Sequence, residues 1–132
     1  MMRPVEKFDE DFFLYCEDTE LCLRLRNHGT IQWVKDAPFI HELGASSSLT
    51  RWTSVARYNR GKELYFRKHG SMTAMGACWL FNRGGAFLRL LVWGVPTLLT
   101  LGLAGRFRRQ SALFARVLFA PLKGPASPTG RY

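Results

Sequence analysis

The acidic and basic residues of this chain are distributed so unevenly that its two halves must behave differently. All ten Asp and Glu residues lie between Glu6 and Glu63, together with nine Lys or Arg residues. Residues 64–132 hold ten Lys or Arg residues and no acid, so the net charge of +9 divides into −1 and +10. Such an asymmetry indicates an anionic partner for the second half, either a membrane surface or a nucleic acid.

Length and composition describe one modest globular domain rather than a disordered chain. The 132 residues are 47% hydrophobic and 22% charged, proportions that permit a packed core. Three segments are predicted: an acid-containing segment over residues 1–73, an apolar and basic helical region over 74–122, and a disordered tail over 123–132. The tail is predicted from its Pro, Gly and Ser content.

The apolar region predicts membrane contact without a regular transmembrane helix. Its uninterrupted part, residues 90–105, is shorter than the roughly 20 residues that a spanning helix needs, and Gly94, Pro96 and Gly102 interrupt it. A basic amphipathic helix is predicted next, with Phe107 and Phe114 on its apolar face. We therefore expect a re-entrant or interfacial hairpin whose basic helix lies on anionic lipid. A buried helical core is the alternative.

The sequence of the first half predicts two helices with short strands between them. A helix is predicted over residues 17–28, ended by Gly29 in the left-handed conformation. Asp18 shares a face with Leu14, Leu21 and Leu25, which would direct its carboxylate inward, partly desolvate it and raise its basicity. On another face Glu20 and Arg24 can pair at i,i+4. Strands are predicted over residues 30–34 and 39–41, with a turn at 35–38. A second helix is expected from about residue 50 to 68.

Residues 8–29, FDEDFFLYCEDTELCLRLRNHG, and residues 33–48, WVKDAPFIHELGASSS, form the most informative segment. The pattern resembles the C-terminal motif of inverting family 2 glycosyltransferases, especially the rhamnosyltransferase-like branch. In that motif F-D-E-x-F-F leads into E-D-x-[DE]-L on a helix, followed by R-x-x-x-x-G, a strand, and a His before a Gly/Ser loop. The matching residues are Phe8, Asp9, Glu10, Phe12, Phe13, Glu17, Asp18, Glu20, Leu21, Arg24, Gly29, His41, Gly44 and Ser46.

The resemblance implies an α/β fold: a truncated acceptor-side segment of the GT-A type, helix-rich as it stands, with C-terminal apolar and amphipathic helices. It implies a nucleotide-sugar donor, a cell-envelope or lipid-linked glycan acceptor, and a divalent metal, Mg or Mn, in the complete enzyme. Family members carry a nucleotide-binding half before this motif, with its own Asp-x-Asp metal site. We therefore expect a missing N-terminal half, and no activity from this chain alone. The expected location is the cytoplasmic face of the bacterial inner membrane, peripheral or re-entrant.

An inverting transferase needs a general base to deprotonate the attacking hydroxyl, and a carboxylate at a helix start suits that task. The resemblance assigns this role to Asp18, with Glu17 orienting it or binding acceptor hydroxyls. The remaining assignments are acceptor binding by Asp9, Glu10, Phe12 and Tyr15, and diphosphate binding by His41, Gly44 and Ser46, with His41 also a weak metal candidate.

Each assignment has a simpler alternative. The helix dipole alone favours acids such as Glu17 and Asp18 in a first turn, and His41 could merely close a strand. Aromatic residues of the motif are more often used in core packing. At the level of the whole chain, the alternative function is a non-catalytic, basic membrane-surface module. A nucleic-acid binder, suggested by Tyr58 and Tyr65 among arginines, is disfavoured because the basic residues are interleaved with long apolar runs.

Overall fold

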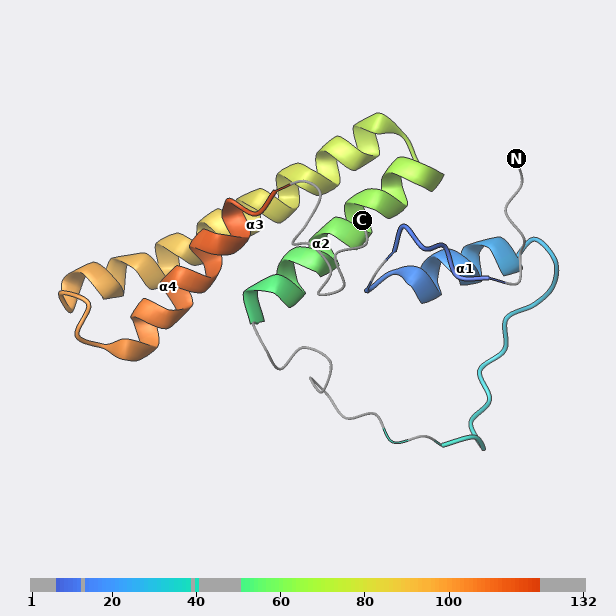
Figure 1. Ribbon diagram of the computed structural model, residues 1–132, viewed down its shortest axis with the longest axis horizontal. Coiled ribbons are helices and arrows are strands. Elements are labelled where there is room, and N and C mark those ends of the chain that lie inside the picture. Colours follow the sequence, from blue (N-terminus) through green and yellow to red (C-terminus); the bar gives the residue numbers. More distant parts are fainter. Residues whose placement is uncertain (1–6, 13, 39, 41–50, 122–132) are drawn as a thin grey trace.

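The computed structural model describes residues 7–12, 14–38, 40 and 51–121. Over these residues the chain forms four α-helices and no strand. The helices are α1 (Glu17–Leu25), α2 (Arg51–His69), α3 (Met72–Leu99) and α4 (Gly105–Leu118) (Figure 1). The second predicted helix is confirmed to within a residue or two at each end. The predicted tail over residues 123–132 lies outside the described residues.

The predicted α/β fold is wrong, because the described residues are helical or irregular and form no sheet. The strand expected over residues 30–34 is an irregular segment with its apolar side chains in solvent: Trp33 is 88% exposed and Val34 is 64% exposed. A β-type run forms a strand only when a second strand completes its hydrogen bonds, and no described residue does so for this run. The other expected strand, residues 39–41, lies outside the described residues except for Ile40.

Helices α2, α3 and α4 pack together, and α3 and α4 form an antiparallel hairpin that extends beyond α2 (Figure 1). Ser71 caps α3 by accepting a hydrogen bond from the amide of Ala74 at 3.1 Å. The helix continues through Gly94 and Pro96, where the sequence predicted interruptions. The chain reverses at Leu101 and Gly102, which both have positive φ angles, of 50° and 74°. The described residues therefore form a helical hairpin, and its expected contact with a membrane stays a prediction.

The apolar face of α4 packs against α3 rather than facing outward. The rings of Phe107 and Trp93 lie 6.1 Å apart, and the hydroxyls of Ser111 and Thr97 are 2.8 Å apart. Arg83 of α3 donates hydrogen bonds to the carbonyls of Val117, Leu118 and Ala120, so its guanidinium caps the C-terminus of α4. The face that the sequence predicted for lipid contact is thus covered within the hairpin.

Helix α1 is shorter than predicted and ends at Leu25 rather than His28. The amides of Asn27 and His28 bond to carbonyls three residues earlier, which tightens the chain and stops the regular helix. Gly29 does not adopt the left-handed conformation predicted for it. Across the described residues, no helix is both long enough and apolar enough to cross a membrane.

Candidate functional site

A cavity of about 470 Å³ lies where the start of α1 faces α2. Helix α1 and the turn before it contribute two carboxylates, a thiol and a phenol, while α2 contributes three aromatic rings and an amine. The lining residues are Tyr15, Cys16, Glu17, Asp18, Thr19, Tyr58, Lys62, Tyr65 and Phe66. Two of the sequence-predicted catalytic carboxylates and one predicted acceptor-binding residue therefore share one cavity.

The turn that enters α1 holds two consecutive residues in the left-handed region. Tyr15 has a φ of 74° and Cys16 a φ of 68°, a conformation that costs a non-glycine residue about 1–2 kcal/mol. The absence of a side chain at Gly61 lets this turn approach α2 closely. A Cβ at that position would lie 2.8 Å from the carbonyl oxygen of Tyr15 and 3.2 Å from Sγ of Cys16. Close packing on α2 therefore accompanies the strained backbone.

The two carboxylates at the start of α1 differ in their surroundings. The Oε2 atom of Glu17 is buried and has no hydrogen-bond partner among the described residues. Asp18 is exposed, and its Oδ1 accepts hydrogen bonds from the amide of Thr19 at 2.7 Å and from its hydroxyl at 3.3 Å. The prediction that Asp18 points inward and is desolvated by leucines is wrong, because it lies on the cavity side of the helix start, open to solvent.

Aromatic rings and one ammonium group form the opposite wall. The rings of Tyr15 and Tyr58 meet edge to face with centroids 5.7 Å apart, and Nζ of Lys62 lies 4.6 Å from the Tyr58 centroid. Burial raises the pKa of the Cys16 thiol above its usual 9.0, and the charges of Asp18 and Glu17 raise it further. Cys16 therefore lines the cavity as a neutral thiol at physiological pH.

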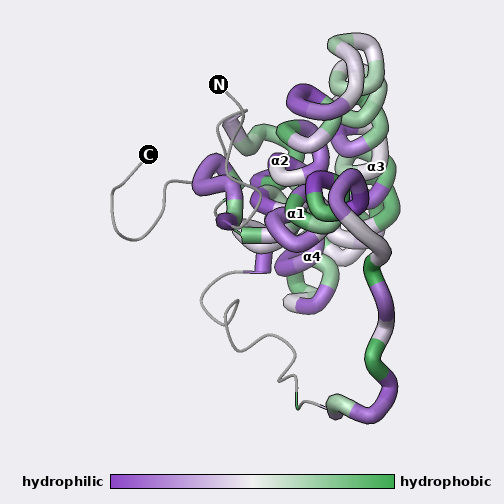
Figure 2. The backbone as a smooth tube through the Cα atoms, turned by 90° about the vertical axis from the view of Figure 1, so that its right-hand side faces the viewer, coloured by the Kyte–Doolittle hydropathy of each residue, from purple (hydrophilic) through white to green (hydrophobic). Residues whose placement is uncertain are grey.

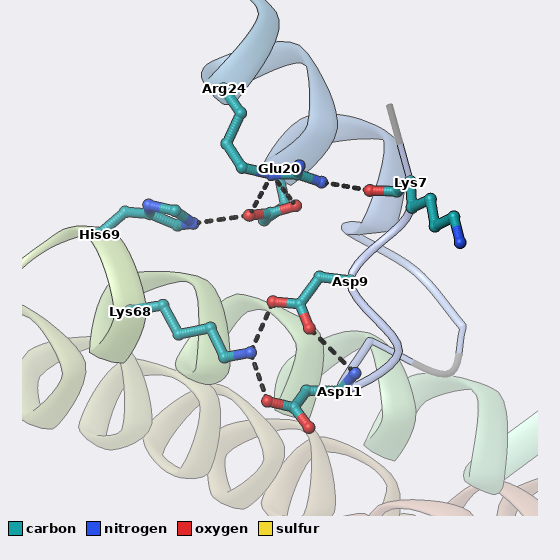
Figure 3. A network of polar contacts seen from close by, with 7 residues as sticks. All are labelled: Lys7, Asp9, Asp11, Glu20, Arg24, Lys68 and His69. Carbon is teal, nitrogen blue, oxygen red and sulfur yellow. Dashed lines mark hydrogen bonds and ion pairs between the residues drawn. The ribbon is translucent and has the colours of Figure 1, made fainter. Parts of the chain in front are cut away.

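A buried network of ion pairs holds the N-terminal segment and α1 against the end of α2 (Figure 3). Glu20 is 1% exposed, and its carboxylate accepts hydrogen bonds from Nε of Arg24 at 2.9 and 3.0 Å, which confirms the predicted i,i+4 pair. Nε2 of His69 lies 3.1 Å from the same carboxylate. Nζ of Lys68 pairs with Asp9 at 2.6 Å and also with Asp11.

The structure places the remaining predicted site residues in varied settings. Asp9 and Phe12 are each 5% exposed and lie within the packed N-terminal segment, not in the cavity lining. Glu10 is exposed on the turn between them. His41, Gly44 and Ser46 lie outside the described residues. The predicted acceptor-binding group is thus divided, with only Tyr15 of its four members on the cavity.

Sequence reasoning missed the contribution of α2 to the cavity. Tyr58, Lys62 and Tyr65 follow one another at spacings of four and three, which places them on one helix face. This periodicity was a usable signal, although it cannot reveal which segment the face would meet. The two tyrosines were instead weighed as nucleic-acid contacts.

Across the part of the chain that the structure describes, no three His, Cys, Asp or Glu side chains converge to hold a metal ion. Glu17 and Asp18 alone do not make a cation site of the kind that Mg²⁺ or Mn²⁺ requires. The divalent metal that the resemblance implies for the complete enzyme therefore stays a prediction, and His41 lies outside the described residues. Comparison of the chain with protein-family models, curated proteins and solved structures finds no match.

Proposed function

We propose that this chain is the acceptor-side segment of an inverting family 2 glycosyltransferase of the rhamnosyltransferase-like branch. In this proposal it positions a cell-envelope or lipid-linked glycan for attack on a nucleotide-sugar donor. The observation that carries the proposal is the cavity itself, in which Glu17 and Asp18 face the tyrosines of α2. The motif resemblance supports the same residues independently of the cavity.

The cavity offers the two kinds of contact that a sugar uses. Aromatic rings such as those of Tyr15 and Tyr58 can pack against the C–H faces of a pyranose, since both surfaces are apolar. Glu17 also lines the cavity, and its carboxylate is a hydrogen-bond acceptor for a sugar hydroxyl. Lys62 adds a donor on the opposite side. The site would thus hold a polyhydroxylated ring in one orientation.

Asp18 is the general base of the proposed reaction. As the acceptor oxygen attacks the anomeric carbon, its proton passes to the Asp18 carboxylate, and the bond from the anomeric carbon to the nucleoside diphosphate breaks with its electron pair on the leaving group. The exposed position of Asp18 leaves its carboxylate accessible to an incoming hydroxyl. Glu17 binds a neighbouring hydroxyl and so orients the ring.

The buried carboxylate network gives Glu20 and Arg24 a positioning role in the proposal. Neither residue lines the cavity. Their ion pair lies on the next turn of α1 and joins that helix to His69 of α2. Because the cavity is formed between the same two helices, the distance between Asp18 and the tyrosines depends on this connection.

Donor binding and the divalent metal, Mg or Mn, belong in this proposal to a separate nucleotide-binding half, as in the resembling family. The chain by itself would then bind an acceptor without transferring sugar. The proposed location is the cytoplasmic face of the bacterial inner membrane, where the chain would be peripheral or re-entrant and would meet lipid-linked acceptors.

The test is sugar transfer by the complete enzyme, with release of the nucleoside diphosphate as the readout. Asp18→Asn should lower turnover by about 10²–10⁴-fold, the usual contribution of a general base. Glu17→Gln should mainly weaken acceptor binding and raise KM. Asp36→Asn, a change at an exposed carboxylate outside the cavity, is the matched control. Turnover that falls less than tenfold in Asp18→Asn, or equally in the control, would reject the assignment.

A further inference from the structure

Helix α3 carries a long apolar surface that no other described part of the chain covers. From residue 80 to the end of the helix, large apolar side chains that are between 46% and 80% exposed lie on one face. Figure 2, which looks nearly along the long axis of the molecule, shows hydrophobic residues among the polar ones of α3. We call this surface the α3 stripe; its members are Leu80, Phe81, Phe87, Leu88, Leu91, Val92, Val95, Leu98 and Leu99.

The hairpin bend continues the stripe. Leu101 is 86% exposed and Leu103 is 87% exposed, so the end of the hairpin is also apolar and open. From residue 80 to residue 99 the helix rises about 29 Å, at 1.5 Å per residue. The opposite face of α3 carries the buried Ala86 and the side chains that contact α2 and α4. An apolar surface of this length on one side of a helix is typical of an interaction site.

Basic side chains border the stripe on the side where α3 and α4 meet. The guanidinium of Arg89 lies 5.8 Å from the Phe114 ring, and that of Arg106 lies 6.0 Å from the Trp93 ring. Arg108, Arg109 and Arg116 are also exposed on α4. Residues 64–132 contain no acid that could neutralise them. The surface therefore pairs an apolar face with exposed arginines from a part of the chain that contains no acid.

We infer that the α3 stripe and the hairpin bend dock on an anionic lipid bilayer, with α3 lying along the interface and the arginines reaching the headgroups. Charge complementarity selects this occupant. Interfacial helices gain affinity from buried apolar area together with attraction to anionic lipid, and this surface supplies both. A protein groove would satisfy the apolar stripe but would leave the row of arginines without partners unless it were acidic as well.

The inference does not depend on the proposed catalytic role. Figure 1 places the hairpin bend and α1 at opposite ends of the longest axis of the molecule. Substitutions on the stripe therefore leave the candidate cavity intact, and substitutions in the cavity leave the stripe intact. Either proposal can fail without the other.

The test is co-sedimentation of the chain with vesicles of phosphatidylcholine alone and of phosphatidylcholine with phosphatidylglycerol. The chain should bind the anionic vesicles, and added salt should weaken that binding. A triple variant, Leu88→Gln, Val92→Gln and Leu99→Gln, should bind at least about tenfold more weakly, because it removes three exposed apolar side chains from the contact. Glutamine preserves side-chain length and helix propensity, so the fold should remain.

The matched control replaces exposed apolar side chains away from the stripe, by Ile31→Gln and Val34→Gln, and should bind like the unchanged chain. Circular dichroism of each variant verifies that the helices are retained. The inference is overturned if the unchanged chain does not bind anionic vesicles, or if stripe and control variants bind alike. It is also overturned if sedimentation without lipid shows a dimer that the stripe variant abolishes, because the occupant would then be a second copy.

Discussion

The region built from the N-terminal segment, α1 and α2 and the α3–α4 hairpin are held together by different kinds of contact. In the first region the carboxylates of Asp9 and Glu20 are buried, and both are paired with cations. In the hairpin, aromatic rings and the hydroxyls of Thr97 and Ser111 are in contact between the two helices. The guanidinium of Arg83 adds a charged contact by capping the C-terminus of α4. One region therefore depends on matched charge and the other on apolar packing.

This difference separates two tasks along the chain. Paired charges have defined geometry, so the first region can hold the cavity carboxylates and tyrosines at fixed positions. Apolar packing is less directional. It holds the hairpin together through the inner face of α3, and the outer face of that helix is also apolar. The uneven charge of the sequence thus corresponds to a polar region that presents chemistry and a hairpin that presents an apolar surface.

Removing Glu20 should produce the largest loss of stability. Glu20→Ala leaves the Arg24 guanidinium without its buried partner, and breaking a buried ion pair from one side costs about 3–5 kcal/mol. Urea unfolding followed by circular dichroism measures the change. Glu10→Ala, at an exposed carboxylate, should change stability by less than about 0.5 kcal/mol. Equal effects of the two substitutions would show that the charge network does not hold this region.

Arg83→Met tests the hairpin in the same way. The methionine keeps much of the apolar stem but leaves the carbonyls at the end of α4 without their donor. The expected loss is about 1–3 kcal/mol, the value of hydrogen bonds to a charged group. Arg108→Met is the control, since Arg108 is an exposed arginine of α4. If the control loses as much stability, the cap is not what anchors α4.

Gly61→Ala tests the close approach of the Tyr15 turn to α2. The new Cβ would lie 2.8 Å from a backbone oxygen, so the turn must shift, at a cost of about 1–3 kcal/mol against a helix-propensity gain of up to about 1 kcal/mol. Gly76→Ala is a matched control on α3, where nothing lies within 4 Å. The control should be stabilised by about 0.5–1 kcal/mol. Thermal unfolding of both variants should shift in opposite directions.

The smallest expected effect concerns the Cys16 thiol. Its pKa is raised in the folded chain, so the folded state retains the proton longer than the unfolded state does. The resulting contribution to stability is complete below the unfolded value of 9.0 and is lost as the pH rises through the folded pKa. When the pH is raised from about 8 into the alkaline range, the free energy of unfolding should therefore fall less in the Cys16→Ser variant than in the unchanged chain. Urea unfolding at several pH values measures this, and equal changes in the free energy of unfolding of the two chains would contradict the prediction.

Local signals predicted the helices well and the strands poorly. The boundaries of α2 follow from a continuous helical pattern that ends near Gly70, whose amide bonds to the carbonyl of Phe66. The pair of Glu20 and Arg24 follows from i,i+4 spacing. A strand, in contrast, depends on a partner elsewhere, and the β-type run containing Ile31 and Trp33 has none among the described residues.

The sequence predicted only part of the candidate site, because local patterns do not show which distant residues meet in the fold. Glu17 and Asp18 are adjacent in sequence and belong to one motif, so their joint position was foreseeable. The burial of Glu20 was not, because it depends on His69, which is 49 residues away in the sequence. The tyrosines of α2 share a visible helical face, but only the folded chain shows that this face meets the start of α1.

The most direct test of the central claim is a titration of the ¹⁵N-labelled chain with rhamnose and glucose, followed by NMR. If the cavity between α1 and α2 binds sugar rings, saturable shift changes should appear at the amides of Tyr15, Thr19, Tyr58 and Tyr65. A double variant, Glu17→Gln and Asp18→Asn, should lose them. Absence of saturable shifts with either sugar, or shifts that persist unchanged in the double variant, would contradict the assignment of this cavity as an acceptor site.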